Sequence, residues 1–196
     1  MWISPTAALR MTEDRTPPGV ESFRTGVARA SLGAAASSLA QAKLQPRCPT
    51  DGDRINPHLW PITAADWKVV LAPRVPDAFQ PPELLFPAFD RHHLPEEDVV
   101  GLVTTVYYPK AITRHDCMAE VIAYADRLAC RWALSSLVVL HVPGDSRHEM
   151  AMHGHILSLP LKHLPTGFAA PTPLLNKKGP GLLHKELLDL RAARCR

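Results

Sequence analysis

The sequence predicts an α+β fold built on a mainly antiparallel sheet, with helices packed on one face of that sheet. Three observations lead to this prediction. Residues 99–108, VVGLVTTVYY, are β-branched and aromatic; residues 110–133 carry a helical repeat of apolar side chains; and two short apolar runs follow at 135–142 and 152–161. Short strands separated by amphipathic helices are typical of a sheet with helices packed against it.

The segment that follows the first of these strands has the signals of an amphipathic helix. Pro109 ends the strand, Thr113 is a favourable N-cap, and Asp116 three residues later resembles a capping box. Apolar residues then recur at alternating spacings of four and three, which places them on one helix face: Met118, Ile122, Ala125, Ala129 and Trp132. We therefore expect a helix that buries this face.

The remainder of the second half completes the predicted domain. In chain order we expect a buried strand at 135–142 (SSLVVLHV), a polar loop at 143–150, a third strand at 152–161 (MHGHILSLPL), a loop at 165–173 (PTGFAAPTP) and a closing helix at 182–194 (LLHKELLDLRAAR). From residue 98 onward the predicted order is therefore strand, helix, strand, loop, strand, loop, helix.

The sequence of the first half of the chain predicts much less regular structure. Residues 1–50 are rich in Ala and Ser and offer few large side chains to bury, so we expect a disordered leader. Residues 51–97 are rich in proline, which predicts an irregular segment with one short strand at WKVVLA. Its aromatic residues could pin it against a neighbouring core: Trp60, Trp67, Phe79, Phe86 and Phe89. The α+β domain itself is expected to span 98–196.

Composition adds a few limits. The net charge of the 196-residue chain is only +3 with neutral histidines, so charge alone does not indicate a nucleic-acid binder. The four cysteines form no CxxC pair, which is typical of reduced thiols in a cytosolic protein. No apolar run approaches the ~18 residues of a membrane span, and the start lacks the apolar core of a secretory signal. We therefore expect a cytoplasmic protein without a membrane partner.

Three histidines near the ends of the last two predicted strands form the candidate site. Side chains alternate along a strand, so His153 and His155 point to the same side. Gly154 between them would let another backbone approach closely, and His141 lies near the end of the preceding strand. If the two strands are neighbours, three imidazoles converge, and such a set suits Mn, Zn, Fe, Ni or Cu with positions left open for substrate oxygen.

Other histidines are weaker candidates. His148 lies in the polar loop and is expected to be solvated, and His115, His163 and His184 are expected to be ordinary surface residues. An isolated His-x-His pair on a strand is more often structural than metal-binding. The alternative that all three candidate histidines are core or surface residues therefore stays open at this point.

Between about Val99 and Phe168 the sequence resembles the MobA/MobL family of plasmid mobilisation relaxases. The similarity lies in the order and spacing of VYYPKAIT, the helix MAEVIAYADRLACRWA, the strand end VVLHVP, the motif MHGHILSL and the turn TGF. The family belongs to the HUH class of DNA endonucleases, which has an antiparallel sheet with helices on one face. The resemblance covers about half of the chain.

The resemblance implies a function for the site. His153 and His155 would be the HUH pair and His141 the third ligand of a divalent metal ion (Mn, Mg or Zn) that orients a scissile phosphate. The partners would be single-stranded DNA at an origin of transfer and accessory mobilisation proteins. The family nucleophile is usually a tyrosine near the N-terminus, which joins to the DNA 5′ end.

The chain departs from the family pattern in four ways. Gly154 stands where the class has a bulky hydrophobic residue, and the loop from His141 to His153 is longer than expected. Ala151 and Met152 replace the usual Asn-Pro before the histidine pair, and the three tyrosines, Tyr107, Tyr108 and Tyr124, lie on the predicted strand and helix and not at the family position. Some relatives use histidine as the nucleophile, and His58 is the residue of that type in the N-terminal half. The sequence thus leaves open a nicking relaxase, a catalytically inactive remnant that binds metal and DNA, and an unrelated α+β domain.

Overall fold

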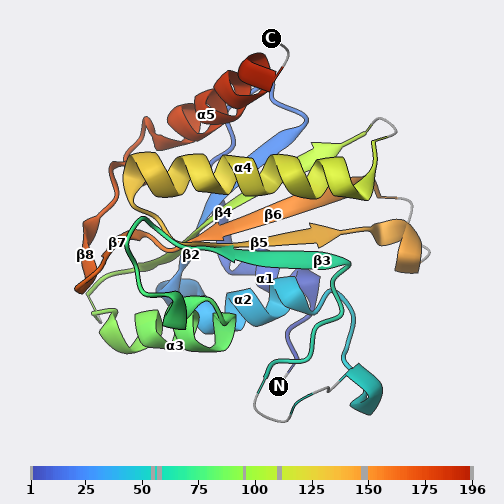
Figure 1. Ribbon diagram of the computed structural model, residues 1–196, viewed down its shortest axis with the longest axis horizontal. Coiled ribbons are helices and arrows are strands. Elements are labelled where there is room, and N and C mark those ends of the chain that lie inside the picture. Colours follow the sequence, from blue (N-terminus) through green and yellow to red (C-terminus); the bar gives the residue numbers. More distant parts are fainter. Residues whose placement is uncertain are drawn as a thin grey trace.

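The protein is built on a six-stranded sheet whose order is β1-β2-β4-β6-β5-β3, with every neighbouring pair antiparallel (Figure 1). The computed structural model describes residues 2–53, 56, 59–94, 96–109, 112–146 and 150–194. The strands of this sheet are β1 (Thr12–Asp14), β2 (Phe23–Arg29), β3 (Asp66–Val70), β4 (Val99–Tyr108), β5 (Ser136–His141) and β6 (Met152–Ser158). The predicted α+β class with an antiparallel sheet is confirmed.

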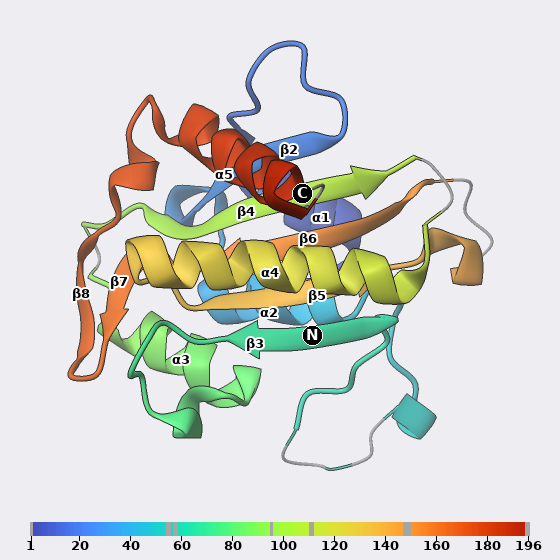
Figure 2. The same ribbon diagram turned by 45° about the horizontal axis from the view of Figure 1, so that its top comes forward.

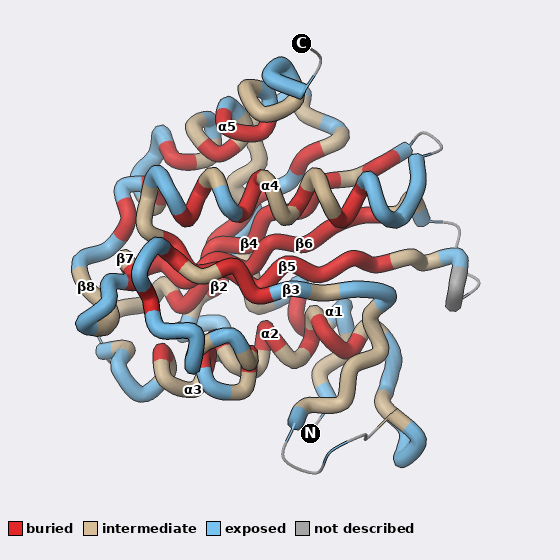
Figure 3. The backbone as a smooth tube through the Cα atoms, viewed as in Figure 1, coloured by how far each residue is buried: buried red, intermediate tan, exposed pale blue. Residues whose placement is uncertain are grey.

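Helices cover both faces of the sheet, whereas the sequence analysis expected them on one face. On one side lie α4 (Arg114–Trp132) and α5 (Gly179–Arg194), and on the other lie α1 (Pro5–Arg10), α2 (Ala36–Leu44) and α3 (Pro82–His92) (Figures 1 and 2). Each layer buries its own apolar cluster against the sheet. The buried residues accordingly concentrate along β4, β5 and β6 between the two layers (Figure 3).

The second half of the chain folds in the predicted order. Helix α4 begins at Thr113, whose hydroxyl accepts a hydrogen bond from the Asp116 amide at 3.0 Å. The helix connects β4 to β5, and β6 then returns between these two strands. The buried face of α4 also includes Val121, Tyr124 and Leu128, while Ile122 and Trp132 are only partly buried.

Residues 2–50, expected to be a disordered leader, are instead part of the fold. Strand β2 pairs with β4 from Phe23↔Val106 to Arg29↔Val99. Helix α2 packs on the sheet through small side chains such as Ala36 and Ala40, which are fully buried. Leu39 and Leu44 of the same helix are also buried, and the small residues around them let the helix lie close to the sheet.

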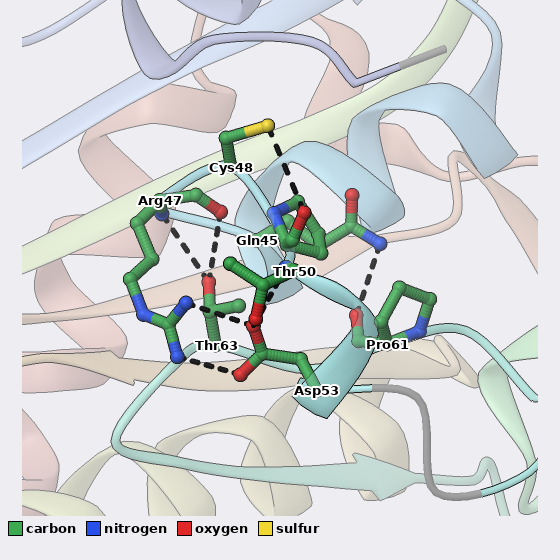
Figure 4. A network of polar contacts seen from close by, with 8 residues as sticks. Gln45, Arg47, Cys48, Thr50, Asp53, Pro61 and Thr63 are labelled. Atoms are coloured by element: carbon green, nitrogen blue, oxygen red, sulfur yellow. Dashed lines mark hydrogen bonds and ion pairs between the residues drawn. The ribbon is translucent and has the colours of Figure 1, made fainter.

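The chain that leaves α2 is held by side-chain hydrogen bonds (Figure 4). Arg47 pairs with both carboxylate oxygens of Asp53, at 2.8 and 2.6 Å. The Gln45 side-chain amide donates to the Pro61 carbonyl at 2.9 Å, and the Thr63 hydroxyl donates to the Arg47 carbonyl at 3.1 Å. These contacts connect the chain that leaves α2 to Asp53, Pro61 and Thr63.

The proline-rich segment 51–97 is also more regular than expected. The predicted short strand is present as β3, which pairs with β5 at the edge of the sheet. Helix α3 was not predicted, because prolines interrupt its sequence; Pro82 occupies the first helical turn, where no backbone donor is needed. The aromatic residues pin the segment as expected, with Phe86 and Phe89 fully buried.

The segment after β6 forms a small hairpin of its own. The predicted third strand ends at Ser158, and β7 (Leu161–Leu164) then pairs with β8 (Gly167–Pro171), in a region expected to be a loop. Gly167 has φ 124°, a conformation that suits glycine in a tight turn. The Phe168 ring packs edge-on against Phe89, with centroids 5.3 Å apart, so the hairpin is anchored to α3.

Candidate metal centre

The strand register brings His141, His153 and His155 to one face of the sheet. His141 on β5 is the direct partner of His153 on β6, and Val139 is the partner of His155. Directly paired residues point to the same side, so all three imidazoles face the α2 layer. Their ring centroids are 5.3, 4.6 and 4.9 Å apart, and one ligand nitrogen of each ring lies within 4.8 Å of the others.

Each imidazole is positioned through one of its two nitrogens. His141 Nε2 donates to the Lys43 carbonyl at 2.7 Å, and His153 Nδ1 donates to the Ala151 carbonyl at 2.9 Å. His155 Nδ1 is hydrogen-bonded to the Thr105 hydroxyl at 2.9 Å. The opposite nitrogen of each ring is thereby left for a ligand. Metal-binding histidines commonly use their second nitrogen in this way, which fixes the tautomer and the ring orientation.

Burial keeps the three histidines neutral. Their exposed fractions are 8%, 6% and 9% in chain order. Burial lowers the pKa of His141 to about 4, lowers the pKa of His153, and holds the pKa of His155 well below its usual value. A neutral imidazole is the form that ligates a metal ion, so the cluster is in its ligating state near neutral pH. Three nitrogen donors of this kind could hold a divalent ion.

Lys43 lies beside the cluster and was not identified from the sequence. It is on α2, is half-buried, and burial lowers its pKa to about 8. After burial, its positive charge is a further cause of the lowered pKa of all three histidines. Residues 1–50 were expected to be a disordered leader outside the fold, so Lys43 was not a candidate. Its position on the buried side of an Ala-rich helix was the signal that could have revealed it.

Gly154 allows helix α4 to lie close behind the histidine pair. A Cβ atom added at Gly154 would stand 2.5 Å from Cγ1 of Val121. The expectation of a close approach is therefore met, but by the side chain of a helix residue and not by a backbone. Because Gly154 faces α4, the two histidines that flank it face away from α4 and toward α2.

Three further histidines can be placed, and one differs from expectation. His115 is exposed and His184 is half-buried against Phe23, with ring centroids 5.1 Å apart. His163, expected at the surface, is 1% exposed, and its Nδ1 is hydrogen-bonded to the Ser135 hydroxyl at 2.8 Å. His163 lies on β7, and its ring stacks on Phe168 of β8, with centroids 4.3 Å apart, in a segment expected to be loop from residue 165 onward. His58 and His148 lie outside the described residues.

The three tyrosines occupy different environments. Tyr108 is buried and donates to Glu120 at 3.1 Å, while Tyr124 is fully buried and donates to the Leu183 carbonyl at 3.0 Å. Tyr107 and Tyr108 were both expected at core positions of the strand, and Tyr108 is at one. Tyr107 is only half-buried, and its ring centroid is 5.5 Å from that of His153. Of the tyrosines, Tyr107 is therefore the one at the rim of the histidine cluster.

Fold and site together define an α+β protein with an antiparallel sheet and a buried three-histidine cluster that could hold a metal ion. Among the solved structures that share this fold is a Staphylococcus aureus structure described as "Molecular Basis of Vancomycin Resistance Transfer in Staphylococcus aureus". The TM-score is 0.68 at 11% sequence identity, covering 86% of this chain and 88% of that one. No protein-family model matches the sequence, and a comparison with curated proteins gives no match.

Among the described residues, no helix combines sufficient length with sufficient apolar character to cross a bilayer.

Proposed function

We propose that this chain is a relaxase-like domain that holds a divalent metal ion between His141, His153 and His155 and binds single-stranded DNA across it. The observation that carries the proposal is the convergence of three buried, neutral imidazoles, each oriented by a hydrogen bond through its other nitrogen. The fold similarity to a protein of resistance transfer supports the same class.

The donor set favours some ions over others. Imidazole nitrogen suits Zn best, and Mn accepts nitrogen although it also favours oxygen, whereas Mg prefers oxygen ligands and retains water. A divalent ion held by three protein nitrogens would keep open positions for a phosphate and would polarise one of its oxygens. Among the ions expected from the sequence, we therefore propose Mn or Zn.

The chain's own cations would hold the DNA. Lys43 on α2 lies beside the cluster, and its positive charge contributes to the lowered pKa of all three histidines. Arg24 on β2 is paired with Thr105, which itself is paired with His155, so Arg24 projects from the same face of the sheet two strands away. Cations on both sides of the site support the binding of a polyanion that passes over it.

Nicking at an origin of transfer is the activity that such a site would serve in a relaxase. It requires a nucleophile at the phosphate. Tyr108 and Tyr124 are buried and hydrogen-bonded, so neither can reach a ligand at the cluster. Tyr107 is the remaining tyrosine and lies at the rim of the cluster. A second candidate function, in which Tyr107 does not react, is a binding module that holds metal and DNA without cutting. In either case the proposed setting is cytoplasmic, with accessory mobilisation proteins as further partners.

Metal uptake is the first test. Titration calorimetry of the purified, metal-free protein with ZnCl₂ and MnCl₂ is expected to give one site per chain, and His153→Ala is expected to abolish it. His115→Ala is the matched control, because His115 is exposed on α4. Wild-type protein that binds neither ion would refute the metal centre.

DNA cleavage is the second test. The protein is incubated with supercoiled plasmid carrying an origin of transfer and with labelled single strands of that origin. Protein attached covalently to a DNA 5′ end on a denaturing gel establishes the nicking function. Metal-dependent retention of the strand without cleavage establishes the binding module. Neither retention nor cleavage would overturn both candidate functions.

A further inference from the structure

A groove of about 590 Å³ lies beside the histidine cluster. Its lining residues come from the segment before and within β2, from the end of β4 and from the residues before β6: Gly19, Glu21, Ser22, Arg24, Tyr107, Pro109 and Met150. This volume is in the range of sites that hold a small organic ligand. The Tyr107 ring forms the boundary between the groove and the cluster, since its centroid is 5.5 Å from that of His153. We call this feature the Tyr107 groove.

The groove continues the candidate metal centre along the sheet. Tyr107 is the direct partner of His153, and Arg24 is the direct partner of Thr105, whose other partner is His155. All these side chains therefore project from the same face, and they lie on the adjacent strands β2, β4 and β6 (Figure 2). A ligand that extends from the histidine cluster toward β2 would enter the Tyr107 groove next.

The chemistry of the lining is mixed. Tyr107 presents a half-buried ring, and the guanidinium carbon of the exposed Arg24 lies 5.7 Å from the ring centroid. Aromatic rings next to arginine are the usual platform for unpaired bases and their phosphates. Glu21 in the same lining can accept hydrogen bonds from a base amino group and disfavours a purely anionic ligand. A nucleotide, which combines a flat base with one phosphate, fits this combination.

We infer that the Tyr107 groove binds one nucleotide of the single strand next to the phosphate at the histidine cluster. The base stacks on the Tyr107 ring, and the guanidinium of Arg24, displaced from that ring, pairs with the adjoining phosphate. This inference rests on the proposed function, because it assigns a subsite to the same DNA strand. The hydroxyl of Tyr107 has no part in it, and Tyr107 acts here through its ring.

Fluorescence anisotropy with a labelled pool of random 12-nucleotide single strands tests the inference, with Mn²⁺ and again with EDTA. Tyr107→Leu removes the ring and is expected to weaken binding at least about fivefold under both conditions. Tyr107→Phe keeps the ring and is expected to bind like the wild type. Arg24→Gln is expected to weaken binding and to reduce the slope of log affinity against log salt by about 0.7. Arg91→Gln is the matched control, because Arg91 is exposed on α3.

The salt series separates the two roles. Tyr107→Leu is expected to leave the salt slope unchanged, because it removes stacking and not charge. If Tyr107→Leu and Arg24→Gln both bind the single strand as tightly as the wild type does, the subsite is overturned and the proposed function stays intact. Loss of binding in Tyr107→Phe, or a covalent DNA adduct that depends on Tyr107, would assign the reacting role to the hydroxyl and would also overturn it. Wild-type protein that binds no single strand would refute the proposed function itself.

Discussion

The side chain of Val121 on α4 occupies the space where a side chain at position 154 would stand. This contact sets the distance between α4 and strand β6, because a Cβ at Gly154 would be 2.5 Å from Val121 Cγ1. On the other face of the same strand, His153 and His155 point into the candidate metal centre. The packing of α4 and the placing of the histidine pair are thus determined at neighbouring positions of one strand.

A larger residue at position 154 is expected to destabilise the fold, and a smaller residue at position 121 is expected to reduce that loss of stability. Gly154→Ala should lower the free energy of unfolding by about 1–3 kcal/mol, because it overpacks a close contact. Val121→Ala alone should also destabilise, through a small cavity. The double variant Gly154→Ala/Val121→Ala should be less destabilised than the sum of the two, which urea unfolding can measure. Additive effects would show that the contact is not the cause.

Metal binding should stabilise the folded protein. At a Zn²⁺ concentration one hundred times the dissociation constant, the gain is expected to be about 2.7 kcal/mol, because the ion binds the assembled site of the folded chain. Thermal unfolding followed by circular dichroism should show a higher midpoint with Zn²⁺ for the wild type and for His115→Ala. The midpoint of His153→Ala should not move. An equal rise in all three proteins would indicate binding elsewhere.

Acid should destabilise the metal-free protein in the window from about pH 6.5 to pH 4. Burial lowers the pKa of His141 and of His163 to about 4, so between these values the unfolded chain takes up protons that the folded chain does not. The stability they contribute is present above pH 6.5 and lost as the pH falls, at about 1.4 kcal/mol per pH unit for each histidine.

Urea midpoints measured between pH 7.5 and 4.5 would check this slope. His163→Leu is the informative variant: whatever its effect on overall stability, it removes one titrating group and should make the pH dependence shallower. A pH dependence equal to that of the wild type would mean that His163 does not titrate as its burial implies.

The second half of the fold could be predicted from sequence because its signals are local. The strand at 99–108, the Thr113 cap and the apolar spacing of α4 each involve residues close in the chain, and the histidine cluster follows once β5 and β6 are neighbours. The alternation of side chains along β6 was enough to put His153 and His155 on one face.

The first half could not be predicted because its stability depends on distant partners. Strand β2 is ordered by pairing with β4, more than 70 residues later in the chain, and α2 is buried through alanines that carry a weak hydrophobic signal. Lys43 and Arg24 belong to these elements, so the cationic part of the candidate site stayed hidden. His163 was expected at the surface because the pairing of β7 with β8, which stacks its ring on Phe168, leaves no local signal in the sequence.

Removal of the Lys43 charge should have opposite effects on the binding of the metal ion and of single-stranded DNA. Its ammonium group lies in the field of all three histidines and repels a divalent cation at the same place. Lys43→Met should therefore tighten Zn²⁺ binding, by at least about tenfold. The same variant should weaken single-strand binding in EDTA and reduce its salt dependence, since one phosphate contact is lost.

Lys185→Met is the control and should change neither affinity, because Lys185 is exposed on α5, which covers the opposite face of the sheet. Calorimetry for the metal and anisotropy for the DNA measure the two effects separately. If Lys43→Met weakens both ligands, the lysine supports the local structure of the site and does not set its charge.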